Sequence, residues 1–226
     1  MLIRSEKLRR VLRVLLPFVL IPALVLLGAV FRGKGYAFLS LCIAVLSFLF
    51  FVSGYERRKT GTRRLILVAI LTALSVTGRF IPVFKPITAV TMLTAMYLGG
   101  ESGFLVGSLS AIISNMYFGQ GPWTPFQMLS WGLIGLAAGG MAGVLKRSRV
   151  ALCGFGFIAG IAYSFIMDIW TVLWYNGGFD LSLYRAALVT ALPFMLLYGC
   201  SNILFLLLLA RPIGEKLERV HIKYGV

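Results

Sequence analysis

The sequence predicts an all-α integral membrane protein, and three observations support this fold class. Hydrophobic residues make up 59% of the 226 residues, whereas charged residues make up only 13%. Successive apolar runs are long enough to cross a hydrocarbon layer of about 30 Å. Within such a layer an open chain must satisfy its own backbone hydrogen bonds, which favours helices. We therefore expect a multi-pass helical protein embedded in a lipid bilayer.

Apolar runs bounded by charges, glycines and prolines define eight candidate helices. The first two, 11–31 and 36–54, contain few polar residues. The basic start of the first resembles a signal peptide, but no convincing cleavage site follows, so we interpret it as an uncleaved span. The fourth and fifth candidates are shorter than the roughly 20 residues of a straight crossing, so they form either two short spans or a re-entrant pair. The remaining six candidates are 64–81, 86–99, 103–118, 125–145, 150–175 and 185–210.

A change of composition at SGYERRKTGTRR, residues 53–64, divides the chain. The two helices before it are uninterrupted, whereas the six after it contain glycines and polar residues. We predict two extra N-terminal transmembrane helices with a basic cytoplasmic linker over 1–62. A six-helix membrane core follows over 63–212, and a cytoplasmic tail over 213–226.

The basic residues predict the orientation of the chain. A net charge of +15 would suit nucleic acid if it lay on one soluble face, but here the charges fall in clumps between apolar runs. Alternating the loops between two sides gathers most of the 22 Lys and Arg residues on one side. The positive-inside rule makes that side cytoplasmic. We expect a cell-membrane protein with both termini in the cytoplasm and no nucleic-acid partner.

The sequence offers little chemistry for catalysis or metal binding. Cys42, Cys153 and Cys200 lie in apolar segments without CxxC spacing, and the one histidine, His221, is near the C-terminal end. Asp168 is the one acid embedded in a predicted span, and no ATP-binding or zinc-protease motif occurs. We therefore expect no metal, no cofactor and no enzymatic activity.

Small residues recur at four-residue spacing, which lets helix backbones approach closely. We expect the two glycine series to serve packing within the protein. The third candidate helix has the same spacing in alanine, at Ala69 and Ala73, which is a weak signal by itself. The glycines are Gly99, Gly103 and Gly107 in one series, and Gly135, Gly139 and Gly143 in the other.

Polar and aromatic residues collect in the half of the core that the topology makes extracytoplasmic. The stretch NMYFGQGPWTPFQM, residues 115–128, contains the outer loop between the fifth and sixth helices. All four tryptophans fall in this half, which an aromatic belt at both interfaces does not predict. Aromatic walls with a few amides and one acid suit a small-molecule pocket, and the alternative is an ordinary interfacial belt.

Asp168 has two interpretations in this setting: it either faces a ligand or forms a structural ion pair with Arg79 or Arg185. The candidate substrate residues are Arg79, Lys85, Asn115, Tyr117, Gln120, Trp123, Gln127, Trp131, Tyr163, Asp168, Thr171, Tyr175 and Asn176.

Together these features resemble the substrate-binding S components of energy-coupling factor (ECF) vitamin transporters. The resemblance covers about residues 63–212 and is carried by Ala69 and Ala73, the loop FGQGPWTPFQ and the spacing of six glycine-rich helices. It implies a protein that captures a vitamin outside the cell and docks on a transmembrane coupling subunit bound to two cytoplasmic ATPases. The resemblance carries the docking role to Ala69 and Ala73. The two extra N-terminal helices depart from the six-helix plan of this family.

The resemblance favours cobalamin or a related corrinoid as substrate, because NMYFGQGPWTPFQMLSWGLIG looks most like the cobalamin-type group. Pantothenate, a thiamine precursor or a flavin are alternatives. An anionic substrate would favour Arg79 and Lys85, and a cationic one Asp168. A lipid-modifying enzyme, a non-transporting scaffold and an autonomous secondary transporter are rival functions; the last would normally show an inverted repeat, and none is visible.

Overall fold

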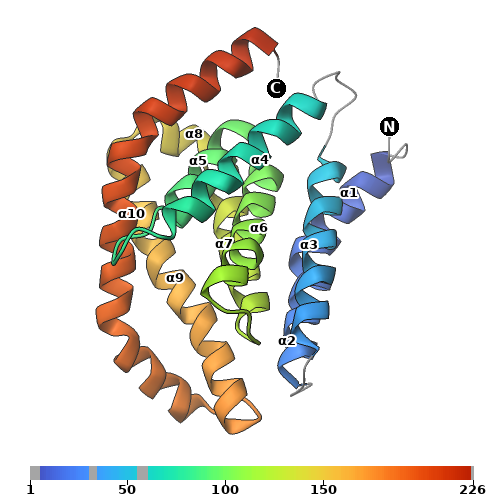
Figure 1. Ribbon diagram of the computed structural model, residues 1–226, viewed down its shortest axis with the longest axis vertical. Helices are drawn as coiled ribbons and strands as arrows, with labels where there is room; N and C mark the ends of the chain where they lie inside the picture. Colours follow the sequence, from blue (N-terminus) through green and yellow to red (C-terminus); the bar gives the residue numbers. More distant parts are fainter. Residues whose placement is uncertain (1–5, 31–34, 55–60, 225–226) are drawn as a thin grey trace.

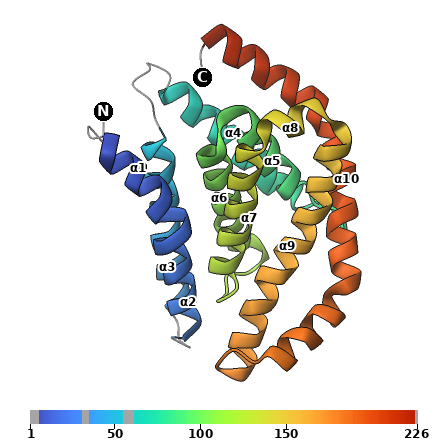
Figure 2. The ribbon, with the colours of Figure 1, turned by 180° about the vertical axis from the view of Figure 1, so that it is seen from behind.

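The computed structural model describes residues 6–30, 35–54 and 61–224, and the regular elements in these residues are all helices. Helix α1 (Glu6–Leu15), a π-helical turn η1 (Leu16–Leu20) and α2 (Ile21–Val30) follow one another without a break. Helix α3 (Tyr36–Ser53) returns beside them. Seen from both sides, α1 to α3 form a layer on the opposite side of the molecule from α10 (Figures 1 and 2).

The rest of the chain forms a helical bundle. The long helices run in alternating directions, so α1 begins and α10 ends at the same end of the molecule (Figure 1). This agrees with the prediction that both termini share one side of the membrane; which side it is stays a prediction. The bundle consists of α4 (Gly61–Gly78), α5 (Ile87–Leu98), α6 (Gly100–Phe118), α7 (Thr124–Gly140), α8 (Ala142–Arg147), α9 (Arg149–Asn176) and α10 (Leu181–Tyr224).

The predicted fold class is confirmed, because each of the eight apolar runs forms helix. Among the described residues, four helices are long and apolar enough to cross a membrane. They are Lys7–Gly28, Tyr36–Ser53, Arg149–Asn176 and Leu181–Val220. The protein is therefore a multi-pass membrane protein.

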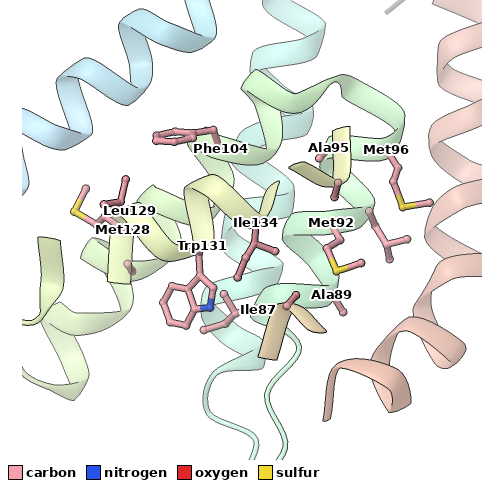
Figure 3. Close-up of a cluster of buried hydrophobic side chains, with 14 of the residues drawn as sticks. Ile87, Ala89, Met92, Ala95, Met96, Phe104, Met128, Leu129, Trp131 and Ile134 are labelled. Atoms are coloured by element: carbon pink, nitrogen blue, oxygen red, sulfur yellow. The ribbon is translucent and has the colours of Figure 1, made fainter. Parts of the chain in front are cut away.

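The short fourth and fifth candidates are two separate helices, α5 and α6, joined by a sharp turn. Gly99 makes this turn with a φ of 91°, a conformation that glycine adopts readily. With 12 residues, α5 is only about 18 Å long. Its side chains from Ile87 to Met96 are all buried, and Figure 3 shows Ile87 and Met92 beside Ile134 of α7. Helix α5 therefore forms the centre of the bundle and is shielded from lipid by its neighbours.

The glycine series pack helices within the protein, as predicted. A Cβ atom on Gly107 would come within 2.6 Å of the backbone of Trp131, and one on Gly139 within 2.4 Å of the Gly100 Cα. These contacts bring α6 and α7 together backbone to backbone. Gly99 and Gly143 differ: Gly99 forms the turn and has only the side chains of Arg64 and Glu101 near its Cβ position, and nothing lies within 4 Å of that of Gly143.

The predicted end of the last helix at residue 210 is wrong, because α10 continues to Tyr224. Pro212 removes one backbone donor, but the helix that follows it is held by other contacts. Glu215 pairs with Arg211 at 3.0 Å, one turn before it. Leu217 is buried in a cluster with α4, α5 and α6. The predicted run 125–145 also differs, because it is divided at Met141 between α7 and α8.

The N-terminal layer packs against α6 and α7. Phe50 of α3 meets Phe104 of α6 edge to face, with ring centroids 5.3 Å apart. At the end that carries both termini, Arg13 of α1 pairs with Glu101 of α6 at 3.6 Å. The layer therefore covers one side of the core and touches α4 near its first turns, where Arg64 lies 5.4 Å from the centre of the Phe51 ring.

Candidate functional site

A cavity of about 110 Å³ lies among α5, α7, α9, α10 and the loop 79–86 that joins α4 to α5. The loop contributes two cations, and the helices contribute aromatic rings and amides. The lining residues are Arg79, Lys85, Ile87, Thr88, Gln127, Trp131, Gly160, Tyr163, Tyr198, Ser201 and Asn202.

Three aromatic rings from three helices form one wall of the cavity. Trp131 of α7 stacks on Tyr163 of α9, with centroids 5.2 Å apart and planes inclined by 18°. Tyr198 of α10 meets Tyr163 edge to face at 5.6 Å. The contact between the two tyrosines depends on close packing of α9 and α10. At Gly160 the helices are so close that a Cβ would lie 2.6 Å from the Gly199 backbone nitrogen. The glycines of α9 and α10 thus bring the two tyrosines together.

A hydrogen-bonded chain of side chains runs behind the aromatic wall. Arg79 donates to Asn115 Oδ1, and the Asn115 amide donates to Gln127 Oε1 at 2.8 Å. The Gln127 amide in turn donates to the Tyr163 hydroxyl at 3.0 Å. Asn115 is fully buried on α6. It therefore fixes the orientation of two residues that line the cavity, one in the loop and one on α7.

The charged groups at the cavity are both cations. The Arg79 guanidinium lies 5.7 Å from the centre of the Trp131 ring and 4.9 Å from that of Phe118. The Lys85 ammonium lies 5.4 Å from the Phe118 ring. Burial lowers the pKa of Lys85, and the charge of Arg79 lowers it further. With no acid among the lining residues, the cavity suits a flat ligand with hydrogen-bond acceptors or negative charge.

The loop 79–86 has an unusual backbone. Val83 has a φ of 64°, which is strained for a β-branched residue. The Phe84 amide donates to the Pro82 carbonyl at 2.7 Å, closing a tight turn around Val83. Strain of this kind persists only where the surrounding contacts hold it. The loop is therefore held in its position beside the cavity.

Six of the predicted substrate-binding residues lie at or directly behind the cavity. The cavity is lined by Arg79, Lys85, Gln127, Trp131 and Tyr163, and Asn115 lies directly behind them.

The predicted residues of the outer loop make local contacts instead. Tyr117 is 73% exposed and packs on Phe80. The Gln120 amide donates to the Ile112 carbonyl. Trp123 packs edge-on against Trp170, with centroids 5.8 Å apart. These side chains stabilise the loop and do not line the cavity.

The predicted residues near the end of α9 also lie away from the cavity. Thr171 donates to the carbonyl of Met167 within its own helix. Tyr175 is 76% exposed. The Asn176 amide donates to the Gly178 carbonyl in the turn before α10.

Asp168 forms neither of the predicted ion pairs, so that interpretation is wrong. Arg79 instead donates to Ser114 and Asn115. One Asp168 carboxylate oxygen is buried and has no hydrogen-bond partner among the described residues. Asp168 does not line the cavity either.

Sequence reasoning missed the contribution of α10, which is Tyr198, Ser201 and Asn202. These residues belong to YGCSN, a polar interruption in the apolar run LLYGCSNILFLL. Ser201 and Asn202 are each 2% exposed, and the Asn202 amide donates to the Gly156 carbonyl of α9. An interrupted apolar run of this kind is the signal that would have identified them.

Comparison with known protein families finds a family model that matches the part of the chain containing this cavity. A family model described as "ECF-type riboflavin transporter, S component" matches residues 59–219, which include every residue that lines the cavity. The match covers well over half of the chain and leaves out α1 to α3. Searches of curated proteins and of solved structures give no significant match. The chain therefore belongs to the family of S components of ECF-type riboflavin transporters.

Proposed function

We propose that this chain captures riboflavin, or a closely related flavin, as the substrate-binding subunit of an ECF transporter. Membership of the family supports a substrate-binding subunit, and the family's description supports a flavin among the vitamins. The preference for cobalamin that the outer loop suggested gains no support from that description. The binding site in this proposal is the cavity beside the loop 79–86.

The stacked pair Trp131 and Tyr163 is the observation that carries the proposal. The isoalloxazine ring of a flavin is flat, with apolar faces and hydrogen-bonding groups along its edge. Aromatic rings 5.2 Å apart with nearly parallel planes provide a matching surface. Gln127, Asn202 and the Arg79 guanidinium provide polar groups beside it. An isoalloxazine ring inserted between Trp131 and Tyr163 would cover the ring faces that these two residues now cover for each other.

The size of the cavity bears on both the substrate and its entry. Pockets for drug-sized ligands measure about 300–1,000 Å³, so a cavity of about 110 Å³ must enlarge before a flavin fits. Movement of the loop 79–86 would provide this space, because the loop contributes Arg79 and Lys85 to the wall. A corrinoid, with its much larger macrocycle, would require a far greater rearrangement.

The proposed partner surface is the outer face of α4. Ala69 and Ala73 are both exposed, and Ile66 and Ile70 are more than half exposed on the same helix. Small exposed residues on an apolar helix allow another helix to approach closely. We propose that this face docks on the transmembrane coupling subunit, which carries the two ATPases.

Binding of riboflavin to purified variants tests the site. Trp131→Ala should weaken binding about tenfold, because it removes the stacking surface. Trp174→Ala is the matched control, since Trp174 does not line the cavity. Quenching of riboflavin fluorescence reports the affinity. Equal binding by both variants would exclude this cavity, and binding of cobinamide without riboflavin would exclude the flavin.

A further inference from the structure

A second hollow lies on the outside of the bundle, in the groove between α9 and α10. Its volume is about 640 Å³, and its wall is almost entirely apolar. It begins beside the first residue of α9, at the end of the molecule that carries both termini (Figure 1). Its walls include Val150, Gly154, Phe157 and Ile158 from α9, and Ile203 and Leu207 from α10.

The groove is open toward the surroundings of the protein. Val150 is 83% exposed, Ile158 63% and Leu207 56%. Nothing lies within 4 Å of the position of a Cβ on Gly154, so this part of the groove is empty space. In a membrane protein such side chains face hydrocarbon, and an unfilled hollow would forfeit the van der Waals contacts of its walls. The groove therefore needs an apolar occupant.

The length of the groove matches one leaflet of a bilayer. Nine residue steps separate Arg149 from Ile158, which corresponds to about 14 Å along the helix axis. Half of a hydrocarbon core of about 30 Å is about 15 Å. A chain that lies in this groove therefore reaches from the membrane surface to the bilayer centre.

One free cation, Arg149, lies at the surface end of the groove, and a second, Arg147, is close to it in the chain. Arg149 lines the groove, and Arg147 precedes Arg149 by two residues at the end of α8. Neither guanidinium has a hydrogen bond or ion pair with another residue in the described part of the chain. Lys146 differs, because it pairs with Glu218 at 3.7 Å. Unpaired cations at this depth attract anionic lipid headgroups.

We propose that the groove between α9 and α10 binds an anionic phospholipid, with one acyl chain along the apolar walls and its phosphate at Arg149. The exposed guanidinium favours a lipid over an apolar partner helix, because a phosphate can pair with Arg149 while the acyl chain covers the apolar walls. A single acyl chain is much thinner than a helix and enters without moving α9 or α10.

Lipid binding to the purified chain tests the headgroup contact. Native mass spectrometry measures the retention of phosphatidylglycerol and of phosphatidylcholine. The wild-type protein should prefer phosphatidylglycerol, and Arg149→Gln should weaken its binding about fivefold without changing that of phosphatidylcholine. Arg185→Gln, at the opposite end of α10, is the matched control and should bind as the wild type does. Equal affinities for the two lipids, or equal effects of the two substitutions, would overturn the proposal.

The native cysteines test the position of the acyl chain without any substitution. Cys153 lines the groove, whereas Cys42 lies on α3 with a similar partial exposure. Phosphatidylglycerol should slow the alkylation of Cys153 by N-ethylmaleimide and leave that of Cys42 unchanged. Equal rates at Cys153 with and without the lipid would overturn the proposal. Protection of Cys153 by the coupling subunit alone, and not by lipid, would assign the groove to a protein interface and overturn it as well.

Discussion

Lys85 and Ser201 hydrogen bond to each other in both directions, although 116 residues separate them in the chain. The Lys85 backbone amide donates to Ser201 Oγ at 2.8 Å. The Ser201 hydroxyl donates to the Lys85 carbonyl oxygen at 3.1 Å. This pair ties the loop 79–86 to α10 at the edge of the cavity. We expect movement of the loop to break both bonds.

Replacement of Ser201 by alanine should therefore speed the exchange of riboflavin. Loss of two hydrogen bonds worth about 0.5–1.5 kcal/mol each predicts dissociation about five- to 140-fold faster. Stopped-flow fluorescence measures the rate. Ser130→Ala is the matched control, because Ser130 is equally buried but bonds only to Phe126 of its own helix. Dissociation at the wild-type rate from Ser201→Ala would show that this pair does not hold the loop.

Replacement of Asn115 by leucine should lower both stability and affinity. The substitution removes the bonds of Asn115 to Arg79 and Gln127, and a buried group left unsatisfied costs about 1–3 kcal/mol. Thermal unfolding in detergent and riboflavin titration measure the two effects. Asn176→Leu removes one exposed bond to Gly178 and should change neither quantity. A stable Asn115→Leu variant with full affinity would contradict a role for this chain of bonds.

Replacement of Ala69 by tryptophan should separate docking from binding. Ala69 is exposed on α4, so the larger ring blocks a close helix partner without disturbing the cavity. Riboflavin affinity should stay unchanged while co-purification with the coupling subunit is lost. Ala186→Trp, also exposed but on α10, should retain the complex. Uptake at the wild-type rate by the Ala69→Trp variant would show that this face of α4 is not the docking surface.

Lys85 should contribute a rise in stability with pH in the alkaline range. Its pKa in the folded protein lies below the usual 10.5, so the unfolded chain binds this proton more strongly. The penalty is complete below the folded-state pKa and disappears as pH rises toward about 10.5. Lys85→Met should flatten this rise in the unfolding temperature, whereas Lys216→Met, at an exposed site on α10, should preserve it. If the unfolding temperature rises equally with pH in the wild type and in Lys85→Met, Lys85 is not the source of the rise.

The sequence predicts the helices well because their apolar runs are long and clearly bounded. It also identifies Trp131, Gln127 and Tyr163, because they stand out as polar or aromatic residues in one half of the membrane. The polar interruption YGCSN marks Ser201 as unusual, but the cavity that it faces depends on neighbouring helices that the sequence pattern does not reveal. The ion pair in one of the two interpretations of Asp168 is not formed, since Arg79 instead bonds to hydroxyl and amide groups of α6.

The end of α10 shows a second limit of sequence reasoning. The apolar run ends at residue 210, two residues before Pro212, but the loss of one hydrogen bond at a proline does not outweigh tertiary contacts beyond it. Leu217 packs into the bundle, and Gly214 lies against the Tyr97 hydroxyl. Such contacts join residues far apart in the chain, so the local sequence pattern does not predict them.

Isothermal titration calorimetry of the purified chain with riboflavin, without ATP or partner subunits, tests the central claim most directly. We expect tight one-to-one binding that Trp131→Ala weakens about tenfold. Absence of binding by folded protein, or binding that Trp131→Ala leaves unchanged, would contradict riboflavin capture at this cavity.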